Sequence, residues 1–194
     1  LRHGYTITSR GCPNRCWFCR VWRVDGDVRE LQVRDGWIVQ DDNLLACSEQ
    51  HVREVFDMLA RQPKRAQFTG GLEAARLKPW HVDLIAGLRP KQVFFAYDQP
   101  DDLEPLRSAR VMLREVYGRD SGHVLRCYVL IGFPGDTIDA AERRLQETVR
   151  IGFMPMAMLW TAASECRQEV MWRRLQRQWA NETIIGCNMR RVPR

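Results

Sequence analysis

Hydrophobic and polar residues follow two different periods along this chain, which predict short strands alternating with longer helices. In residues 48–60, Val52, Val55, Phe56 and Leu59 recur at helical spacing behind Ser48, a residue type that caps helices. Residues 92–97 instead form a short β-rich run. The same patterns predict further strands at 5–8, 37–41, 66–69, 124–131 and 154–160, and further helices at 79–88, 101–117, 136–150 and 164–180.

The order of these elements predicts an α/β fold. Residues 31–33 and 37–39 flank the turn dipeptide Asp35-Gly36, which predicts a β-hairpin whose second arm continues into the main sheet. Six strands alternating with helices imply parallel pairing through right-handed crossovers. Both a doubly wound sheet and an incomplete barrel fit, and we predict the second, a partial (β/α)6 TIM-type barrel. It would span residues 1–163, with residues 164–194 packed on it as a C-terminal helix and tail.

Composition and charge describe an ordinary globular protein with an excess of arginine. The chain has 194 residues, 45% of them hydrophobic, and a net charge of +6. Lysine occurs only at Lys64, Lys78 and Lys91, so arginine supplies most of the positive charge. This excess has two explanations, codon bias in a GC-rich genome or an acidic partner such as nucleic acid or an electron-transfer protein. No apolar run is long enough to cross a membrane and no secretory leader precedes the first motif, so we expect a cytoplasmic protein.

The most specific motif is a cluster of three cysteines, Cys12, Cys16 and Cys19, spaced C-x-x-x-C-x-x-C. One tight loop with this spacing can present three thiolates to a [4Fe–4S] cluster and leave the fourth iron without a protein ligand. Such an open position is typical of a catalytic metal site. The alternative is a zinc site, which needs a fourth ligand such as His3, Cys47 or Cys187.

The cysteine motif resembles the signature of the radical S-adenosylmethionine (SAM) superfamily, in which an aromatic residue, here Phe18, precedes the third cysteine. The resemblance implies that Cys12, Cys16 and Cys19 bind a [4Fe–4S] cluster and that the amino and carboxylate groups of SAM chelate the open iron. Reductive cleavage of SAM then releases a 5′-deoxyadenosyl radical, which abstracts hydrogen from a substrate.

Two further motifs look like SAM-binding elements of that superfamily. Gly70-Gly71-Leu72-Glu73 resembles the Gly-Gly-Glu element that binds the SAM amino group, with Leu72 inserted before Glu73. The insertion makes the two glycines safer candidates than Glu73; an ordinary strand-to-helix turn is the alternative. Residues 132–137 resemble the GFPGET segment of the methylthiotransferase and cobalamin-dependent branch. The resemblance implies that Ile131 and Gly132 form part of the adenine pocket, while Asp136 is favoured as a helix cap.

Other candidates follow predicted strands. Tyr97 and Asp98 lie where family members often contact the SAM ribose, and a plain loop position is equally compatible with Asp98. Residues 41–43 could hold a polar group of the substrate or cap the next turn. Trp160 is a candidate cover for adenine, although a core position is favoured. No catalytic hydrogen donor can be named, and buried packing is favoured for the remaining cysteines, Cys47, Cys127, Cys166 and Cys187.

The predicted function is therefore a radical SAM enzyme with SAM and a [4Fe–4S] cluster as cofactors. The known methylthiotransferases and cobalamin-dependent enzymes carry additional domains, so we expect a single-domain enzyme acting on a large, open substrate. A nucleic-acid base or modified nucleotide is one candidate, and small metabolites or a peptide are others. A flavodoxin- or ferredoxin-type protein would donate the electron. The alternative function is a zinc- or cluster-binding nucleic-acid module without catalysis.

The C-terminal helix bears on the nucleic-acid prediction. Trp172, Leu175 and Trp179 fall on one face, with Arg173, Arg174 and Arg177 around it. Packing of the tryptophans on the barrel is the favoured interpretation. Stacking of nucleic-acid bases on them is the alternative.

Overall fold

In a computed structural model of the protein, described over residues 3–118, 123–160 and 170–192, six parallel strands form the main sheet. Its order is β1-β4-β5-β6-β7-β8, which follows the order of the strands in the chain. A doubly wound sheet reverses this order at a switch point, and no reversal occurs here. The strands are β1 (Tyr5–Thr6), β4 (Ile38–Val39), β5 (Gln67–Phe68), β6 (Gln92–Tyr97), β7 (Leu125–Ile131) and β8 (Met154–Leu159).

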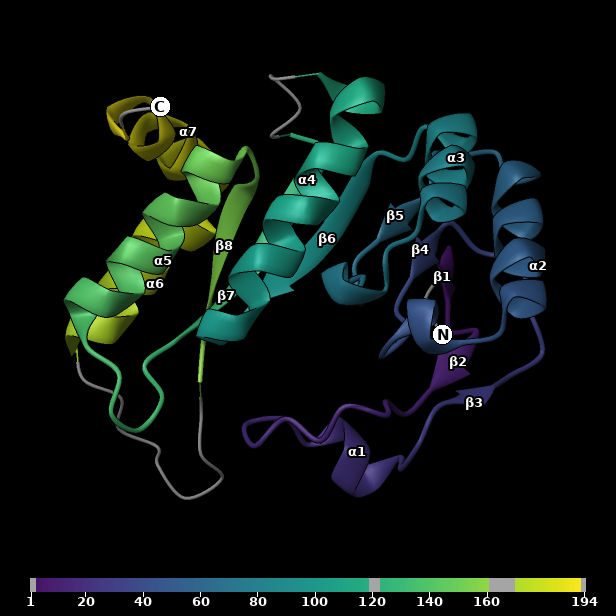
Figure 1. Ribbon diagram of the computed structural model, residues 1–194, viewed down its shortest axis with the longest axis horizontal. Coiled ribbons are helices and arrows are strands. Elements are labelled where there is room, and N and C mark those ends of the chain that lie inside the picture. The colour runs from purple at the N-terminus through teal and green to yellow at the C-terminus, as the bar shows by residue number, and fades with distance from the viewer. Residues whose placement is uncertain (1–2, 119–122, 161–169, 193–194) are drawn as a thin grey trace.

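The helices follow the strands in the predicted alternation and cross the molecule in chain order, from α2 to α5 (Figure 1). These are α2 (Glu49–Ala60), α3 (Pro79–Leu88), α4 (Leu103–Tyr117) and α5 (Ile138–Ile151), with 3-10 turns at Leu44–Ala46, Ala74–Arg76 and Pro100–Asp102. As predicted, the Ser48 side chain caps α2 by accepting a hydrogen bond from the His51 amide. Short loops and parallel strands thus confirm the predicted α/β fold.

One face of the sheet forms the hydrophobic core beneath these helices. Alternate residues of β6 and β7 point into it, including Phe95 and Val129, both fully buried. The opposite face carries Phe94 and Tyr128, whose rings stack with centroids 4.4 Å apart. Each long strand therefore has one face for the core and one of mixed character.

The predicted hairpin at residues 31–39 is wrong. β4 pairs in parallel with β1 and β5, and residues 31–33 form no strand. Instead, β2 (Ser9–Arg10) pairs antiparallel with β3 (Arg29–Glu30), upstream of the predicted turn. Gly36 explains the difference, because a side chain there would meet the Thr6 Cβ at 2.7 Å. The glycine allows close approach to β1 rather than a hairpin turn.

Two helices follow β8 in the described part of the chain. α6 (Val170–Ala180) directs Leu175 and Trp179 into the main core, and Trp172 packs against that core. The arginines of this helix, Arg173, Arg174 and Arg177, are exposed. A further helix, α7 (Glu182–Arg191), begins at Asn181, whose side chain caps it, and was not predicted. Residues 164–169 of the predicted helix lie outside the described residues.

No helix within the described ranges is both long and apolar enough to cross a lipid bilayer.

Candidate functional site

The loop that carries the three cysteines lies between β2 and α1 (Val21–Val24), at the same end of the sheet as the loop from β7 to α5 (Figure 1). This end holds the C-terminal ends of the parallel strands, where α/β proteins place their sites. Cys12, Cys16 and Cys19 are each half-buried. The Cys19 amide donates to the Cys16 carbonyl at 3.1 Å, which closes a tight turn between two of them.

The three thiols are close enough to influence one another. Burial first, and then the neighbouring Cys19 and Cys12, raise the pKa of Cys16 to about 11. A metal would favour the thiolate and offset this shift. Within residues 3–118, 123–160 and 170–192, no three His, Cys, Asp or Glu side chains already stand as a ready-made metal-binding group. In the described part of the chain, the loop brings the three predicted ligands near one another, but their sulfurs are not arranged as a metal-binding group.

Two carboxylates at the end of β4 hold the strand and loop that lead to Cys12. Buried Asp41 accepts hydrogen bonds from the Thr8 amide at 2.6 Å, the Thr8 hydroxyl at 2.5 Å and the Ser9 hydroxyl at 3.0 Å. Asp42 accepts from the Gly11 amide at 2.9 Å and pairs with Arg10 at 3.2 Å. Both carboxylates have internal partners, so their place is to fix the cysteine loop rather than to hold a substrate.

Asn43, the next residue, connects this support to the cysteines. Its amide nitrogen lies 3.4 Å from the Cys12 sulfur and 2.6 Å from the Glu73 carboxylate. Glu73 also accepts from Arg76 at 2.6 Å. The inserted Leu72 is turned into the core with 2% exposure, which leaves Glu73 at the mouth of the sheet. The insertion therefore does not remove Glu73 from the neighbourhood of the cysteines.

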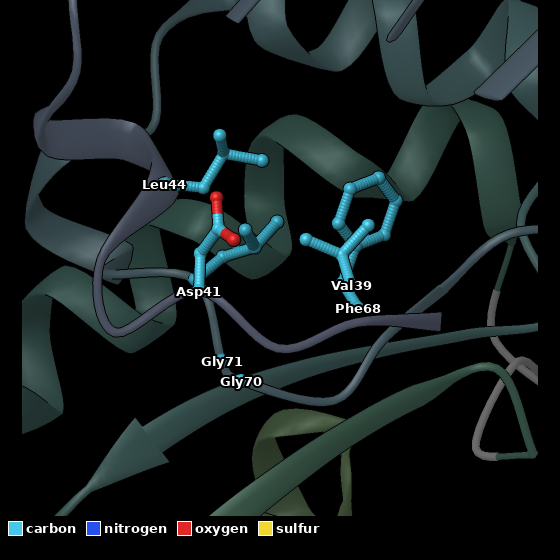
Figure 2. Close-up of a pocket in the computed structure, with 7 residues that line it drawn as sticks. Val39, Asp41, Leu44, Phe68, Gly70 and Gly71 are labelled. Atoms are coloured by element: carbon cyan, nitrogen blue, oxygen red, sulfur yellow. The ribbon is translucent and has the colours of Figure 1, made fainter. Parts of the chain in front are cut away.

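Gly70 and Gly71 line a small pocket together with Val39, Asp41, Leu44, Phe68 and Leu72 (Figure 2). Glycine serves a different purpose at each of these two positions. A side chain at Gly70 would meet the Asp41 carbonyl oxygen at 2.1 Å, so Gly70 is required by the approach of two strands. Gly71 has a φ of +95° and open space beside it. Gly71 is thus the position where a ligand could approach the backbone.

Asp98 follows β6 at the end of the sheet that carries the cysteine loop, whereas the Tyr97 side chain points to the helical face of the sheet. The Asp98 carboxylate accepts from the Leu130 amide at 3.1 Å, and burial followed by nearby Asp102 raises its pKa to about 7. The Asp102 and Asp98 carboxylates each raise the pKa of Cys16 further. The Tyr97 hydroxyl donates instead to Glu147 of α5 at 2.8 Å, on the helical side of the sheet. Burial and Glu147 raise the pKa of Tyr97.

The loop after β7 is organised around a buried ion pair that the sequence did not reveal. Asp136 accepts from the Gly132 amide at 2.9 Å and pairs with Arg144 at 2.8 Å, and its side chain is 1% exposed. The helix cap predicted for Asp136 is wrong, because Thr137 caps α5 by accepting from the Ala140 amide. The Ile131 side chain is fully buried in the main core, and its carbonyl accepts a hydrogen bond from the Trp160 amide at 2.9 Å.

Trp160 takes part in an aromatic cluster at the mouth. Its ring centroid lies 6.5 Å from that of Trp17, which is also 5.6 Å from Phe133 and 5.4 Å from Phe18. This cluster links the cysteine loop to the ends of β7 and β8. Trp17 is 46% exposed, although it lies between two cysteines of the motif. The sequence patterns did not single out Trp17, although its place inside the motif was the available signal.

The other cysteines do not share one environment. Cys127 is fully buried, as expected, and Cys47 is half-buried, where burial raises its pKa to about 11. Cys187 is exposed on α7, which contradicts the expected buried position. Cys166 lies outside the described residues.

Comparison of the chain with protein families and with curated proteins gave no match.

Proposed function

We propose that this protein is a radical SAM enzyme whose Cys12, Cys16 and Cys19 hold a [4Fe–4S] cluster. The observation that carries the proposal is the position of the C-x-x-x-C-x-x-C loop at the C-terminal ends of six parallel strands. When bound, the cluster and SAM would supply a 5′-deoxyadenosyl radical for hydrogen abstraction from a substrate. The ordered strand sequence supports a partial (β/α)6 barrel as the architecture, with β1 and β8 as its two edges.

The residues around the loop fit such a cofactor pair. Asp41 and Asp42 hold the backbone before Cys12, while Gly71 leaves open space beside the chain at the end of β5. Glu73, Asp98 and the backbone at Gly132 lie at the same end of the sheet. These groups would orient SAM, and the aromatic cluster of Trp17, Phe133 and Trp160 would limit access of water to the mouth.

The substrate and the electron donor belong to this proposal as well. A flavodoxin- or ferredoxin-type protein in the cytoplasm would supply the electron. A nucleic-acid base or nucleotide remains a candidate substrate, on the basis of the net charge of +6. The tryptophans of α6 do not support it, because Trp179 is buried and Trp172 packs against the core.

Anaerobic reconstitution tests the cluster directly. The wild-type protein should bind about four irons and four sulfides and absorb at roughly 400 nm. Combined replacement of Cys12, Cys16 and Cys19 by Ala should remove both, whereas the matched Cys187→Ala variant should load normally, because Cys187 is exposed on α7, away from α1 and the loop before it (Figure 1). Retention of four irons by the triple variant would exclude the assignment. One bound zinc instead would favour the non-catalytic module.

Binding of SAM is tested separately by calorimetry on the loaded protein. Gly71→Val should weaken SAM binding while the cluster stays intact, because the branched side chain would occupy the open space beside the backbone. Gly118→Val is the matched control, since it introduces the same side chain at another positive φ with open space, at the C-terminal end of α4. Equal SAM affinities in the two variants would remove Gly71 from the site.

A further inference from the structure

In the described part of the chain, Asn43 is the residue whose side chain can donate a hydrogen bond to the sulfur of a predicted cluster ligand. The Asn43 amide nitrogen lies 3.4 Å from the Cys12 sulfur, within range of an N–H···S hydrogen bond. Asn43 is only 4% exposed, so water does not compete for this bond. The two residues are 31 positions apart, and the fold alone brings them together.

The orientation of the Asn43 amide is fixed by its surroundings. Its nitrogen carries two hydrogens, and two acceptors face it, the Cys12 sulfur and a Glu73 oxygen at 2.6 Å. Rotation of the amide by half a turn would place its oxygen against both acceptors. The oxygen, Oδ1, is buried and has no hydrogen-bond partner among the described residues. The amide thus leaves its own acceptor unpaired in order to donate to sulfur and carboxylate.

Glu73 is in turn held in place by Arg76. Its Oε2 atom accepts from Arg76 at 2.6 Å as well as from Asn43. A continuous path of hydrogen bonds therefore runs from Arg76 through Glu73 and Asn43 to Cys12. It connects the ends of β4 and β5 to the cysteine loop, so the sheet itself determines how the donor meets the sulfur.

We propose that Asn43 is a positioning residue that donates a hydrogen bond to the Cys12 thiolate and thereby raises the reduction potential of the cluster. This inference rests on the proposed function. A hydrogen bond to a cluster sulfur withdraws negative charge and favours the reduced state, which carries one more electron. Glu73 acts through Asn43, because its carboxylate keeps the amide hydrogens directed at the sulfur.

The test is an anaerobic redox titration of the SAM-free, reconstituted protein, in which electron paramagnetic resonance reports the fraction of reduced cluster. Asn43→Leu removes the donor at similar volume and should shift the midpoint potential to a more negative value. Asn14→Leu is the matched control, an amide in the cysteine loop itself for which the described part of the chain shows no side-chain hydrogen bond. Its midpoint should equal that of the wild type.

A second variant covers the case in which Asn43→Leu loads poorly. Asn43→Ala also removes the donor, with less bulk next to the cysteine loop and without changing the charge at Glu73, and should likewise shift the midpoint to a more negative value. If Asn43→Leu alone loses the cluster, with native circular dichroism and a fully loaded Asn14→Leu control, the midpoint of Asn43→Ala decides the proposal.

Wild-type midpoints in both Asn43→Leu and Asn43→Ala would overturn the role of Asn43. A wild-type protein that holds no iron–sulfur cluster would instead defeat the proposed function, so the two failures are distinguishable.

Discussion

The two halves of the sheet are built in different ways. β6, β7 and β8 have six or seven residues each and pair through long, regular ladders over a hydrophobic core. β1, β4 and β5 have two residues each, and buried side-chain hydrogen bonds extend the contacts between their ends. Most of the candidate chemistry, including the cysteine loop, Asn43 and Glu73, lies on the second half.

This difference separates stability from chemistry. A regular ladder satisfies backbone groups with little dependence on particular side chains, so apolar packing dominates in β6 to β8. Around the short strands, the Asp41 and Asp42 side chains accept backbone hydrogen bonds that longer strands would form with each other. They thereby hold in place the segment that leads to Cys12. Substitutions in β6 to β8 should therefore reduce overall stability, and those around β1, β4 and β5 should also disturb the cysteine loop.

The largest effect is expected from truncation of the regular half. Phe95→Ala should lower the free energy of unfolding by about 3–5 kcal/mol. The fully buried ring packs edge-on against Phe153, and its removal would leave a cavity in the core. Denaturant titration measures the change. Val111→Ala, at a position 70% exposed on α4, should stay within about 0.5 kcal/mol. A loss below about 1 kcal/mol for Phe95→Ala would contradict this account of the core.

A slightly smaller loss of stability is expected at the end of β4. Asp41→Ala should cost about 3 kcal/mol, because the Thr8 amide and two hydroxyls lose their acceptor in a buried place. It should also reduce iron retention after reconstitution, which Phe95→Ala should not do under native conditions. Asp83→Ala, an exposed aspartate of α3, is the control. Normal iron retention in Asp41→Ala would show that the loop does not depend on this carboxylate.

The boundary between the two halves should be sensitive to pH through Asp98. Its pKa rises from 3.8 in its ordinary state to about 7 in the fold, so the folded protein binds a proton that the unfolded chain releases. Stability should then fall as pH rises between these values, by roughly 2 kcal/mol from pH 5 to pH 7. Asp98→Asn should flatten this part of the profile. Identical pH profiles for the two proteins in denaturant titrations would contradict the shift.

The smallest effect is expected on the outer surface of α6. Combined replacement of Arg173, Arg174 and Arg177 by Ala should change the free energy of unfolding by less than about 1 kcal/mol, because all three side chains are exposed. Leu175→Ala, on the buried face of the same helix, should cost about 2–5 kcal/mol. Similar losses for the two variants would show that the arginines support the core after all.

Much of the fold could be predicted because periodicity and capping are local signals. The limits of β6 match the predicted strand, and Ser48 caps α2 as its position before an amphipathic run suggests. The hairpin prediction failed because the same glycine-containing dipeptide serves a turn or a close approach of strands. Asp136 failed similarly, since an acidic residue before a helix can equally take part in a buried ion pair.

The sequence by itself determined the strand and helix pattern of this protein and the spacing of its three candidate thiolate ligands. Only the tertiary structure decided that Leu72 turns inward, that Glu73 reaches Asn43, and that Asn43 donates to the Cys12 sulfur. These contacts join residues about thirty positions apart along the chain, at the ends of different strands. Local pattern carries no information about such pairs, because the geometry of the assembled sheet brings them together.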